Sequence, residues 1–399
     1  MNTTELPVII AGAGPVGMVA AAKLVKNGIA VRVLEKSGEL SLESRASTFH
    51  PPTLDMLDDL GYARPLIEQG LIAPKVQYAA TADGNLATLD FATISDLTRH
   101  PYRLQAEQFK LTRIILDDLI KDPLFSIAFN TEIVGVTQNS SGVIAHTLGP
   151  DGPGHFSTNW LIGADGAGSA VRRSLDIPFE GFTWPERFLV VTTTADAKQI
   201  RPEIESVSYW ADPQRWYFFL RIQGAWRIMF PVDPSMPDEV ATSREFARES
   251  LASVLPGNND LPIEHVTIYR VHQRVATTFQ KGRVFLAGDA AHINNPLGGM
   301  GMNGGVHDAL NLSEKLVKVI KGGEDPSILA SYDRQRRAVT VDAIQVGTIN
   351  NKKNLEAKTQ EDQRAYRESM RKAASSVEGA REVLRRISMI DSLDKAASL

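Results

Sequence analysis

A short apolar strand followed by a glycine-rich turn constrains this chain more than any other feature. The run Val8–Gly17 reads VIIAGAGPVG, with three glycines in the spacing GxGxxG. In this spacing Gly12 permits the tight turn, Gly14 lets the backbone approach a pyrophosphate, and Gly17 lets the following helix pack on the sheet. The helix N-terminus favours an anion because its first N–H groups lack partners. The segment predicts a βαβ unit that binds a dinucleotide, although a glycine turn in an ordinary α/β protein is the alternative.

A second apolar strand that ends in an acid supports the same interpretation. Residues 31–34 read VRVL, and Glu35 and Lys36 follow them directly. An acid about 20 residues beyond the glycine turn can accept hydrogen bonds from the hydroxyls of an adenosine ribose. The two strands, the turn and the acid therefore form one dinucleotide-binding pattern.

Composition excludes several functional classes. The 399 residues are 43% hydrophobic, which suffices for one large or two ordinary domains, and the net charge of −4 leaves no basic excess for nucleic acid. The chain has no cysteine, and its eight histidines lack metal-binding spacings, so we expect no metal site. Residues 1–5 lack signal-peptide features, and no apolar run is long enough to span a bilayer. We therefore expect a cytoplasmic protein.

The α/β pattern is interrupted between residues 188 and 271, where aromatic-rich segments predict an antiparallel sheet. Beyond Gly304 the chain reads as mostly helical, and its last apolar stripe, from Val377 to Ile390, is expected to pack on the first domain rather than on a membrane surface. The periodicity predicts helices over 52–60, 108–119 and 243–254, and strands within 74–92 and over 127–136, 142–148, 207–210, 216–222 and 226–232.

Two further segments place an acid and glycines at the end of a strand. The second motif, Gly163–Ser169, reads GADGAGS, and the third begins with GDAAH over Gly288–His292 and continues to Asn303. An acid at a strand end can hold a ribose or ribityl hydroxyl, and the glycines bring backbone N–H groups to the next helix. His292 in the third motif is expected to have a structural role.

With these three ordered motifs, the chain resembles the single-component flavoprotein aromatic hydroxylases of the 4-hydroxybenzoate hydroxylase type, the group A flavoprotein monooxygenases. The resemblance covers almost the full length, and it is specific for the family rather than for one member. It implies an α/β fold with a Rossmann-like FAD-binding domain over residues 1–186 and 271–399, ending in C-terminal helices. It also implies an inserted antiparallel-sheet substrate domain over 187–270, with strands from about 74–100.

The resemblance implies non-covalent binding of FAD by residues from all three motifs. Asp289 would hold the ribityl chain, and Asp165 would contact both FAD and NAD(P)H. For the glutamine near the flavin, Gln108 is the first choice and Gln105 the alternative register. The implied cofactor-binding residues are Gly12, Gly14, Pro15, Val16, Gly17, Glu35, Lys36, Arg45, Gln108, Asp165, Gly166, Gly288, Asp289, Pro296, Gly299, Gly301, Met302 and Asn303.

Candidate catalytic and substrate-binding residues come from the loops and the inserted sheet. Pro296 would lie at the reacting edge of the flavin, and His50 either borders the flavin or caps a helix. Strand alternation puts Tyr217, Phe219 and Arg221 on one side, where Arg221 could bind a substrate carboxylate and Tyr217 a phenolic oxygen. A register slip of one residue would instead turn all three away.

The implied activity is the hydroxylation of a small aromatic or heteroaromatic substrate, a hydroxylated acid, by NAD(P)H and O2 through a flavin hydroperoxide. The alternatives are a flavin-dependent reductase acting on an isoprenoid double bond, a halogenase and a non-catalytic FAD-binding regulator. Residues 226–231 do not match the halogenase segment Trp-x-Trp-x-Ile-Pro. The choice between NADH and NADPH, and between monomer and homodimer, stays open.

Overall fold

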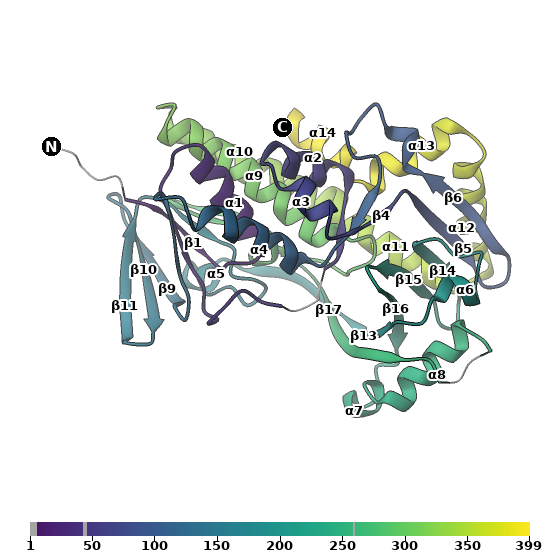
Figure 1. Cartoon of the computed structure of the whole chain (residues 1–399). Coiled ribbons are helices and arrows are strands. Elements are labelled where there is room, and N and C mark those ends of the chain that lie inside the picture. Colours follow the sequence, from purple (N-terminus) through teal and green to yellow (C-terminus); the bar gives the residue numbers. More distant parts are fainter. Residues whose placement is uncertain (1–5, 43–45, 258–259) are drawn as a thin grey trace.

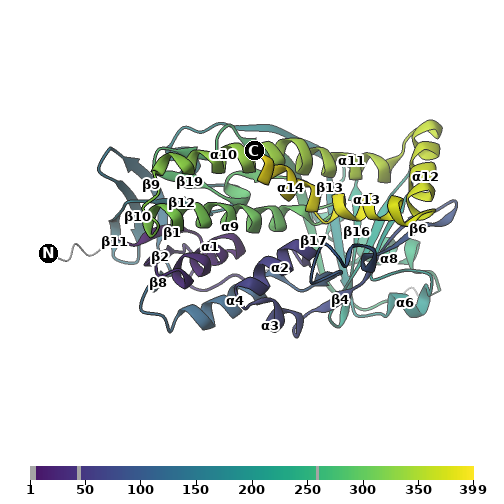
Figure 2. The same ribbon diagram turned by 90° about the horizontal axis from the view of Figure 1, so that it is seen from above.

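Two large sheets lie at opposite ends of the molecule, and long helices run between them (Figure 1). The computed structural model describes residues 6–42, 46–257 and 260–399. Figure 2 shows α9, α10 and α11 extending lengthwise from the six-stranded sheet towards the eight-stranded one. In the described ranges, no helix is long and apolar enough to cross a membrane.

The six-stranded sheet is the predicted dinucleotide-binding unit. Its central strand, β1, is buried along its whole length, as the uninterrupted apolar run VIIA requires of a parallel strand covered on both faces. Helix α1 (Pro15–Lys26) begins with proline at its first position, where the missing N–H is no loss. The strand order is β18 (Gln280–Lys281), β19 (Val284–Leu286), β12 (Leu161–Gly163), β1 (Val8–Ala11), β2 (Val31–Leu34) and β8 (Phe125–Ala128).

The eight-stranded sheet is antiparallel except where β14 pairs with β5 in parallel. Alternate residues point to its two faces, so one face packs on α8 (Arg244–Val254) and the other on the C-terminal helices. Its order is β20 (His292–Ile293), β17 (Ile263–Ala276), β13 (Phe179–Thr193), β16 (Ala225–Val232), β15 (Tyr217–Ile222), β14 (Val207–Ala211), β5 (Lys75–Ala80) and β6 (Gly84–Asp90). The sheet thus extends beyond the inserted segment on both sides.

Two small sheets and several helices complete the fold. One sheet comprises β9 (Glu132–Gln138), β10 (Val143–Gly149) and β11 (Gly152–Thr158), and the other β3 (Thr48–Phe49), β7 (Arg103–Gln105) and β4 (Leu71–Ala73). The helices are α2 (Pro51–Asp59), α3 (Ala63–Ile67), α4 (Gln108–Leu119), α5 (Ala170–Ser174), α6 (Ala197–Ile200), α7 (Asp238–Ala241), α9 (Met300–Ile320), α10 (Ala330–Val339), α11 (Val346–Glu356), α12 (Gln360–Ala374), α13 (Val377–Ile387) and α14 (Ile390–Ser398).

Helices α12 and α13 close the eight-stranded sheet, whereas α14 packs on α10. Helix α12 packs on β6, and α13 packs on β6 and on the short helix η1 (Phe91–Ile94). The apolar stripe of α13 enters the same core as Tyr209 and Phe218 of the sheet. The expectation that this stripe packs on the first domain is therefore wrong, because the nearest uncovered apolar surface belongs to β6 and η1.

Most predicted elements are present with small shifts. Helix 108–119 is confirmed with its bounds, and helix 243–254 begins one residue later. The predicted strand 127–136 is in fact two strands, β8 and β9, which belong to different sheets. A turn at Asn130, with φ at +51°, separates them, and apolar periodicity alone does not reveal it.

Candidate active site

The first glycine turn has the close approaches that its spacing predicts. At Gly12, φ is +95°, and an added Cβ would lie 2.5 Å from the Ala164 carbonyl oxygen. At Gly17 an added Cβ would lie 2.1 Å from the carbonyl oxygen of Gly12. Gly14 differs, because an added Cβ there would meet no atom within 4 Å. The open space at Gly14 leaves room for a pyrophosphate to approach the backbone.

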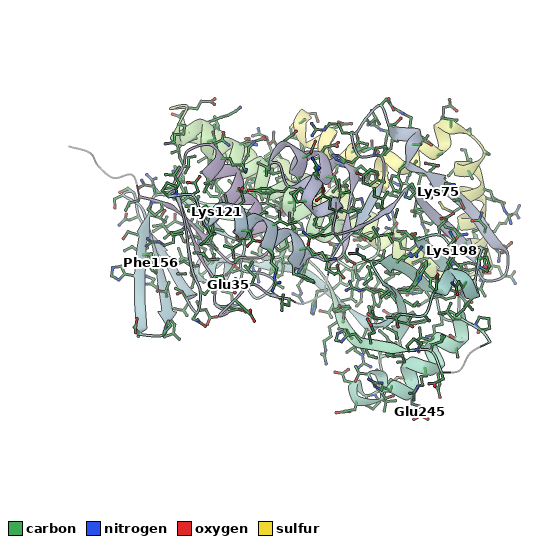
Figure 3. The ribbon with its side chains drawn as sticks, in the orientation of Figure 1. Glu35, Lys75, Lys121, Phe156, Lys198 and Glu245 are labelled. Atoms are coloured by element: carbon green, nitrogen blue, oxygen red, sulfur yellow. The ribbon has the colours of Figure 1, made fainter. Side chains whose placement is uncertain are left out.

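Glu35 stabilises this turn from the end of β2. One carboxylate oxygen accepts the Ala13 N–H at 2.8 Å, and the other accepts the Ser37 N–H at 2.9 Å. Glu35 lies in the part of the molecule that holds the six-stranded sheet (Figure 3). It lines a cleft together with Gly12, Gly14, Lys36 and Asp165. Residues of the first two motifs thus meet at one cleft.

Asp165 gives this cleft an unpartnered acceptor. Its Oδ2 accepts the Val171 N–H at 3.2 Å, whereas its Oδ1 is buried and has no partner among the described residues. Buried oxygens are almost always hydrogen-bonded in native proteins, so this atom favours a ligand hydroxyl. The following Gly166, with φ at +81°, has open space beside it. Open space at Gly14 and Gly166 and a free acceptor fit a dinucleotide cofactor such as FAD.

Buried charged side chains around Asp308 hold the third motif in place. Asp308 accepts the Gly288 N–H at 3.1 Å, His292 Nε2 at 2.8 Å and Arg336 Nε at 2.6 Å. Burial opposes ionisation of Asp308, but Arg336 and His292 outweigh it and lower the pKa of Asp308 to about 2. The structural role predicted for His292 is confirmed. Asp289, next to Gly288, is exposed.

The loop between β20 and α9, which we call the flavin loop (Asn295–Gly299), is tied to β3 by one amide. The buried Asn303 donates from Nδ2 to the carbonyls of Thr48 and Gly299, at 2.8 and 2.6 Å, and its Oδ1 accepts the His50 N–H at 2.9 Å. Within the loop, Pro296 is exposed. Gly301 and Met302 lie in the first turn of α9, whose N–H groups no helix carbonyl can satisfy.

His50 occupies the N-cap position of α2, but its side chain holds the flavin loop instead of capping the helix. Its Nε2 donates to the Gly298 carbonyl oxygen at 2.9 Å, and no side-chain hydrogen bond caps α2. Burial and the nearby Arg103 guanidinium keep the pKa of His50 well below its usual value, so the ring is neutral. A neutral ring with one nitrogen on a loop carbonyl acts as a positioning residue, so a catalytic role for His50 finds no support in this contact.

Of the two candidate glutamines, Gln105 has the more constrained environment. Gln105 is fully buried, its Oε1 accepts the Thr48 hydroxyl at 2.8 Å, and its Nε2 has no partner among the described residues. Gln108 is half-buried at the start of α4, and only its backbone N–H is bonded, to Ala46. The geometry therefore favours the alternative register, with Gln105 beside the flavin loop. Arg45 lies outside the described residues.

A second, narrow cavity lies between the eight-stranded sheet and the C-terminal helices. We call it the sheet cavity. Gly298 of the flavin loop lines one side of it. The other walls include Tyr78 of β5, Tyr209 of β14, Leu355 of α11 and Met370 of α12. The sheet cavity therefore connects the aromatic face of the sheet with the flavin loop.

The predicted trio Tyr217, Phe219 and Arg221 lies on the opposite face of the sheet, away from the sheet cavity. Tyr217 and Phe219 belong to the core that packs on α8, and Arg221 lies 5.7 Å from the Trp226 ring on that same face. The alternation is as predicted, and of the two orientations that the sequence left open the structure has the one in which the trio faces α8. Periodicity alone does not determine which face of a strand lies towards a cavity. Tyr209 and Phe218 occupy the face towards the C-terminal helices.

Sequence comparisons identify relatives over most of the chain. The FAD binding domain family matches residues 5–346. Para-nitrophenol 4-monooxygenase of Pseudomonas sp. (strain WBC-3) is 35% identical over 337 residues, which cover 83% of each chain. The 6-hydroxy-3-succinoylpyridine 3-monooxygenase of Pseudomonas putida (strain DSM 28022 / S16) is 31% identical over 383 residues, covering 95% of this chain and 96% of that one.

Solved structures agree with these relatives. The crystal structure of p-nitrophenol 4-monooxygenase from Pseudomonas putida DLL-E4 is similar over 98% of both chains, with a TM-score of 0.91 and 30% identity. A ternary complex of aklavinone-11 hydroxylase with FAD and aklavinone covers 87% of this chain and 69% of that one, with a TM-score of 0.76 and 26% identity. The motifs, the match to the FAD binding domain family and these relatives show that the chain belongs to the FAD-dependent aromatic hydroxylases of the group A flavoprotein monooxygenases.

Proposed function

We propose that this enzyme uses NAD(P)H and O2 to hydroxylate a small aromatic or heteroaromatic substrate that carries an ionisable group. The observation that carries the proposal is the sheet cavity, whose aromatic walls open on Gly298 of the flavin loop. The relatives named for 4-nitrophenol and 6-hydroxy-3-succinoylpyridine support a substrate of this class. The reductase, halogenase and regulator alternatives are not favoured by any of these relatives.

FAD would be held without a covalent bond between the cleft at Gly14 and the flavin loop. Glu35 and Asp165 would accept cofactor hydroxyls, and the first turn of α9 would offer N–H groups to the flavin ring. When bound, this cofactor supplies the redox chemistry that couples NAD(P)H oxidation to activation of O2. The protein's own groups position the ring, hold the substrate beside it and exclude water.

Residues at the flavin loop would set the geometry of the reaction. The neutral His50 and Asn303 hold the loop backbone through two side-chain contacts, to the Gly298 and Gly299 carbonyl oxygens, and a third hydrogen bond joins these two residues to each other. Pro296 is exposed on the loop. The unpartnered Nε2 of Gln105 gives this region another donor for the cofactor. We propose Pro296 as the residue at the reacting edge, and Gln105 in place of Gln108 as the flavin contact.

We propose the division into an FAD-binding unit, residues 1–186 and 271–399, and a substrate-binding unit, 187–270 with the strands from 74–100. The separate apolar cores on the two sheets support it in outline, although α12 and α13 pack in the core of the eight-stranded sheet and so cover the substrate-binding unit. A single dinucleotide fingerprint supports transient docking of NADH or NADPH. We further propose a cytoplasmic monomer or homodimer that binds no nucleic acid, as the net charge of −4 favours.

The experiment is a substrate panel with the FAD-loaded protein. Nitrophenols, hydroxybenzoates and hydroxylated pyridines are scored for stimulated NAD(P)H oxidation and for hydroxylated product. We expect at least one compound to stimulate NAD(P)H oxidation and to be converted to a hydroxylated product. Protein that binds FAD but shows no stimulation with any compound contradicts the proposal and favours a regulator.

A further inference from the structure

Arg103 is a buried cation in the wall of the sheet cavity. It lies in β7, two residues before Gln105, and is 1% exposed. Arg103 lines the cavity together with Tyr78, Tyr209 and Arg386. Its charge also acts on His50, the residue that holds the Gly298 carbonyl. Arg103 therefore lies between the substrate face of the sheet and the flavin loop.

The contacts of Arg103 leave most of its donors unused. Nη2 reaches the Ile387 carbonyl oxygen only at 3.4 Å, and Nε is buried with no partner. No acidic side chain forms an ion pair with Arg103 anywhere in the described ranges. A guanidinium carries five N–H donors, and burying a charge without an anion is costly. The Arg103 guanidinium therefore has room for an anionic hydrogen-bond acceptor that the described residues do not supply.

Two other buried arginines have stronger partners. Arg336, equally buried, donates to the Asp308 carboxylate at 2.6 Å, although its Nη1 has no partner among the described residues. Arg172 donates to two carbonyl oxygens at 2.7 Å each. Arg103 has neither arrangement. Its 5.7 Å approach to the Phe91 ring is a packing contact that does not use the N–H groups.

The surroundings of Arg103 suit an aromatic ring. Tyr78 and Tyr209 stack with their centroids 5.6 Å apart, and the hydroxyl of Tyr366 is buried without a partner. Burial raises the pKa of Tyr78 to about 12, so this hydroxyl is a neutral donor at physiological pH. Met370 and Ile387 supply the apolar part of the wall. A ring with one anionic oxygen would satisfy both the apolar wall and the unused donors.

We propose that Arg103 is the anion-binding residue of the substrate site, and that the enzyme takes its aromatic substrate as an anion, with a phenolate or carboxylate oxygen on this guanidinium. The inference rests on the proposed function, because it assigns the substrate to the sheet cavity. It replaces Arg221, which lies on the far face of the sheet. Arg386, exposed at the cavity wall, adds positive charge there.

The test measures equilibrium binding to the FAD-loaded, oxidised enzyme by calorimetry and flavin difference spectra, without turnover. Two matched pairs serve as probes: 4-nitrophenol with its methyl ether, and 4-hydroxybenzoate with 4-hydroxybenzamide. In the first pair only 4-nitrophenol can form a phenolate. In the second pair only 4-hydroxybenzoate carries a carboxylate. The variants are Arg103→Gln, Arg103→Lys and Arg386→Gln. Arg364→Gln, whose side chain is 81% exposed on α12, is the control for loss of a positive charge.

We expect the wild type to prefer the anion of at least one pair, and Arg103→Gln to weaken binding of that anion by about 10- to 100-fold while the neutral partner is little changed. Arg103→Lys should retain part of the preference, since it keeps the charge and loses the fork of donors. Arg364→Gln should bind both compounds as the wild type does.

Three results would overturn the inference: equal binding of anion and neutral partner in both pairs by the wild type, a preference that survives in folded, FAD-loaded Arg103→Gln, or a preference that only Arg386→Gln removes. If Arg103→Gln does not fold, the wild-type comparison and Arg103→Lys decide. Failure of the proposed function is distinguished by the substrate panel, because an enzyme that hydroxylates an aromatic compound but shows no anion preference loses only this inference.

Discussion

Individual glycines in the first turn have different physical tasks, and single substitutions separate them. Gly12 and Gly17 face backbone atoms at distances that no Cβ tolerates, whereas Gly14 faces open space. The first two glycines therefore serve the packing of the protein itself. Gly14 serves the ligand, because its missing side chain leaves room for the phosphates.

Gly14→Ala should lower FAD affinity without destabilising the apoprotein. Its φ of −69° suits alanine, and the new methyl group would occupy only the space of the pyrophosphate. We expect a loss of about 1.5–3 kcal/mol in binding, the value of a charge-assisted hydrogen bond. Gly17→Ala is the matched comparison, since its Cβ would overlap the Gly12 carbonyl and lower the apoprotein melting temperature. Calorimetric titration measures the FAD affinity of the two variants, and thermal melts measure the stability of their apoproteins. Equal losses of melting temperature in both apoproteins would contradict the different roles of Gly14 and Gly17.

A buried histidine makes stability depend on pH. Burial and then Arg336 lower the pKa of His307 from 6.5 to about 3, and its Nε2 pairs with the Thr53 hydroxyl at 2.9 Å. Below pH 6.5 the unfolded chain binds a proton at this site that the folded chain does not bind, so stability falls as the pH falls towards 3.

The expected size of this effect is about 2 kcal/mol of unfolding free energy between pH 7 and about pH 5. His307→Gln should reduce the pH dependence by that amount, although it also lowers stability at neutral pH. Urea unfolding at the two pH values gives the comparison. If both proteins lose stability equally on acidification, His307 is not the group responsible.

At the scale of elements, α13 forms part of the wall of the sheet cavity. Its stripe of Val383, Leu384 and Ile387 packs against η1 and β6, and Arg381 forms an ion pair with Asp96. An exposed ion pair of this kind contributes little, so burial of the stripe dominates the attachment of the helix. Packing of this C-terminal helix therefore affects the shape of the sheet cavity.

Leu384→Ala should destabilise the protein by about 2–5 kcal/mol, because this side chain is fully buried. Val377→Ala, on the same helix but 67% exposed, should change stability by less than about 0.5 kcal/mol. Denaturant midpoints provide the measurement. A similar cost for both changes would mean that α13 is not packed as described.

At the scale of the whole molecule, the long strands β13 and β17 extend from the core of one large sheet to the core of the other. Phe179 at the start of β13 packs on the core of the six-stranded sheet, and Phe188 further along packs on the C-terminal side of the eight-stranded sheet. Because such a strand contributes to both cores, unfolding of one core removes packing that stabilises the other. The enzyme should unfold as one cooperative unit despite its two proposed units.

Two probes can test this cooperativity. Trp210, Trp216 and Trp226 are buried in the cores of the eight-stranded sheet, so tryptophan fluorescence reports mainly that sheet, while flavin release reports the other. FAD at 100 times its dissociation constant should stabilise by about 2.7 kcal/mol and shift both transitions together. A fluorescence midpoint that does not respond to FAD would show independent unfolding of the two units.

The sequence alone determined the features that depend on local spacing. The glycine turns, the acids at strand ends and the helix at 108–119 follow from backbone conformations and periodicities that neighbouring residues set. The same motifs, through the family resemblance, predicted FAD binding and aromatic hydroxylation. These features need no knowledge of distant contacts.

The tertiary structure decided what depends on which surfaces meet. Three features involve residues far apart in the chain: the face of the sheet that receives Tyr217 and Arg221, the burial of Gln105 against Thr48, and the packing of α13 on β6. Arg103 carries no sequence signal, since a single arginine in a short strand is ordinary. Only the folded chain shows it buried without an acid, because ion pairing is set by the approach of distant segments.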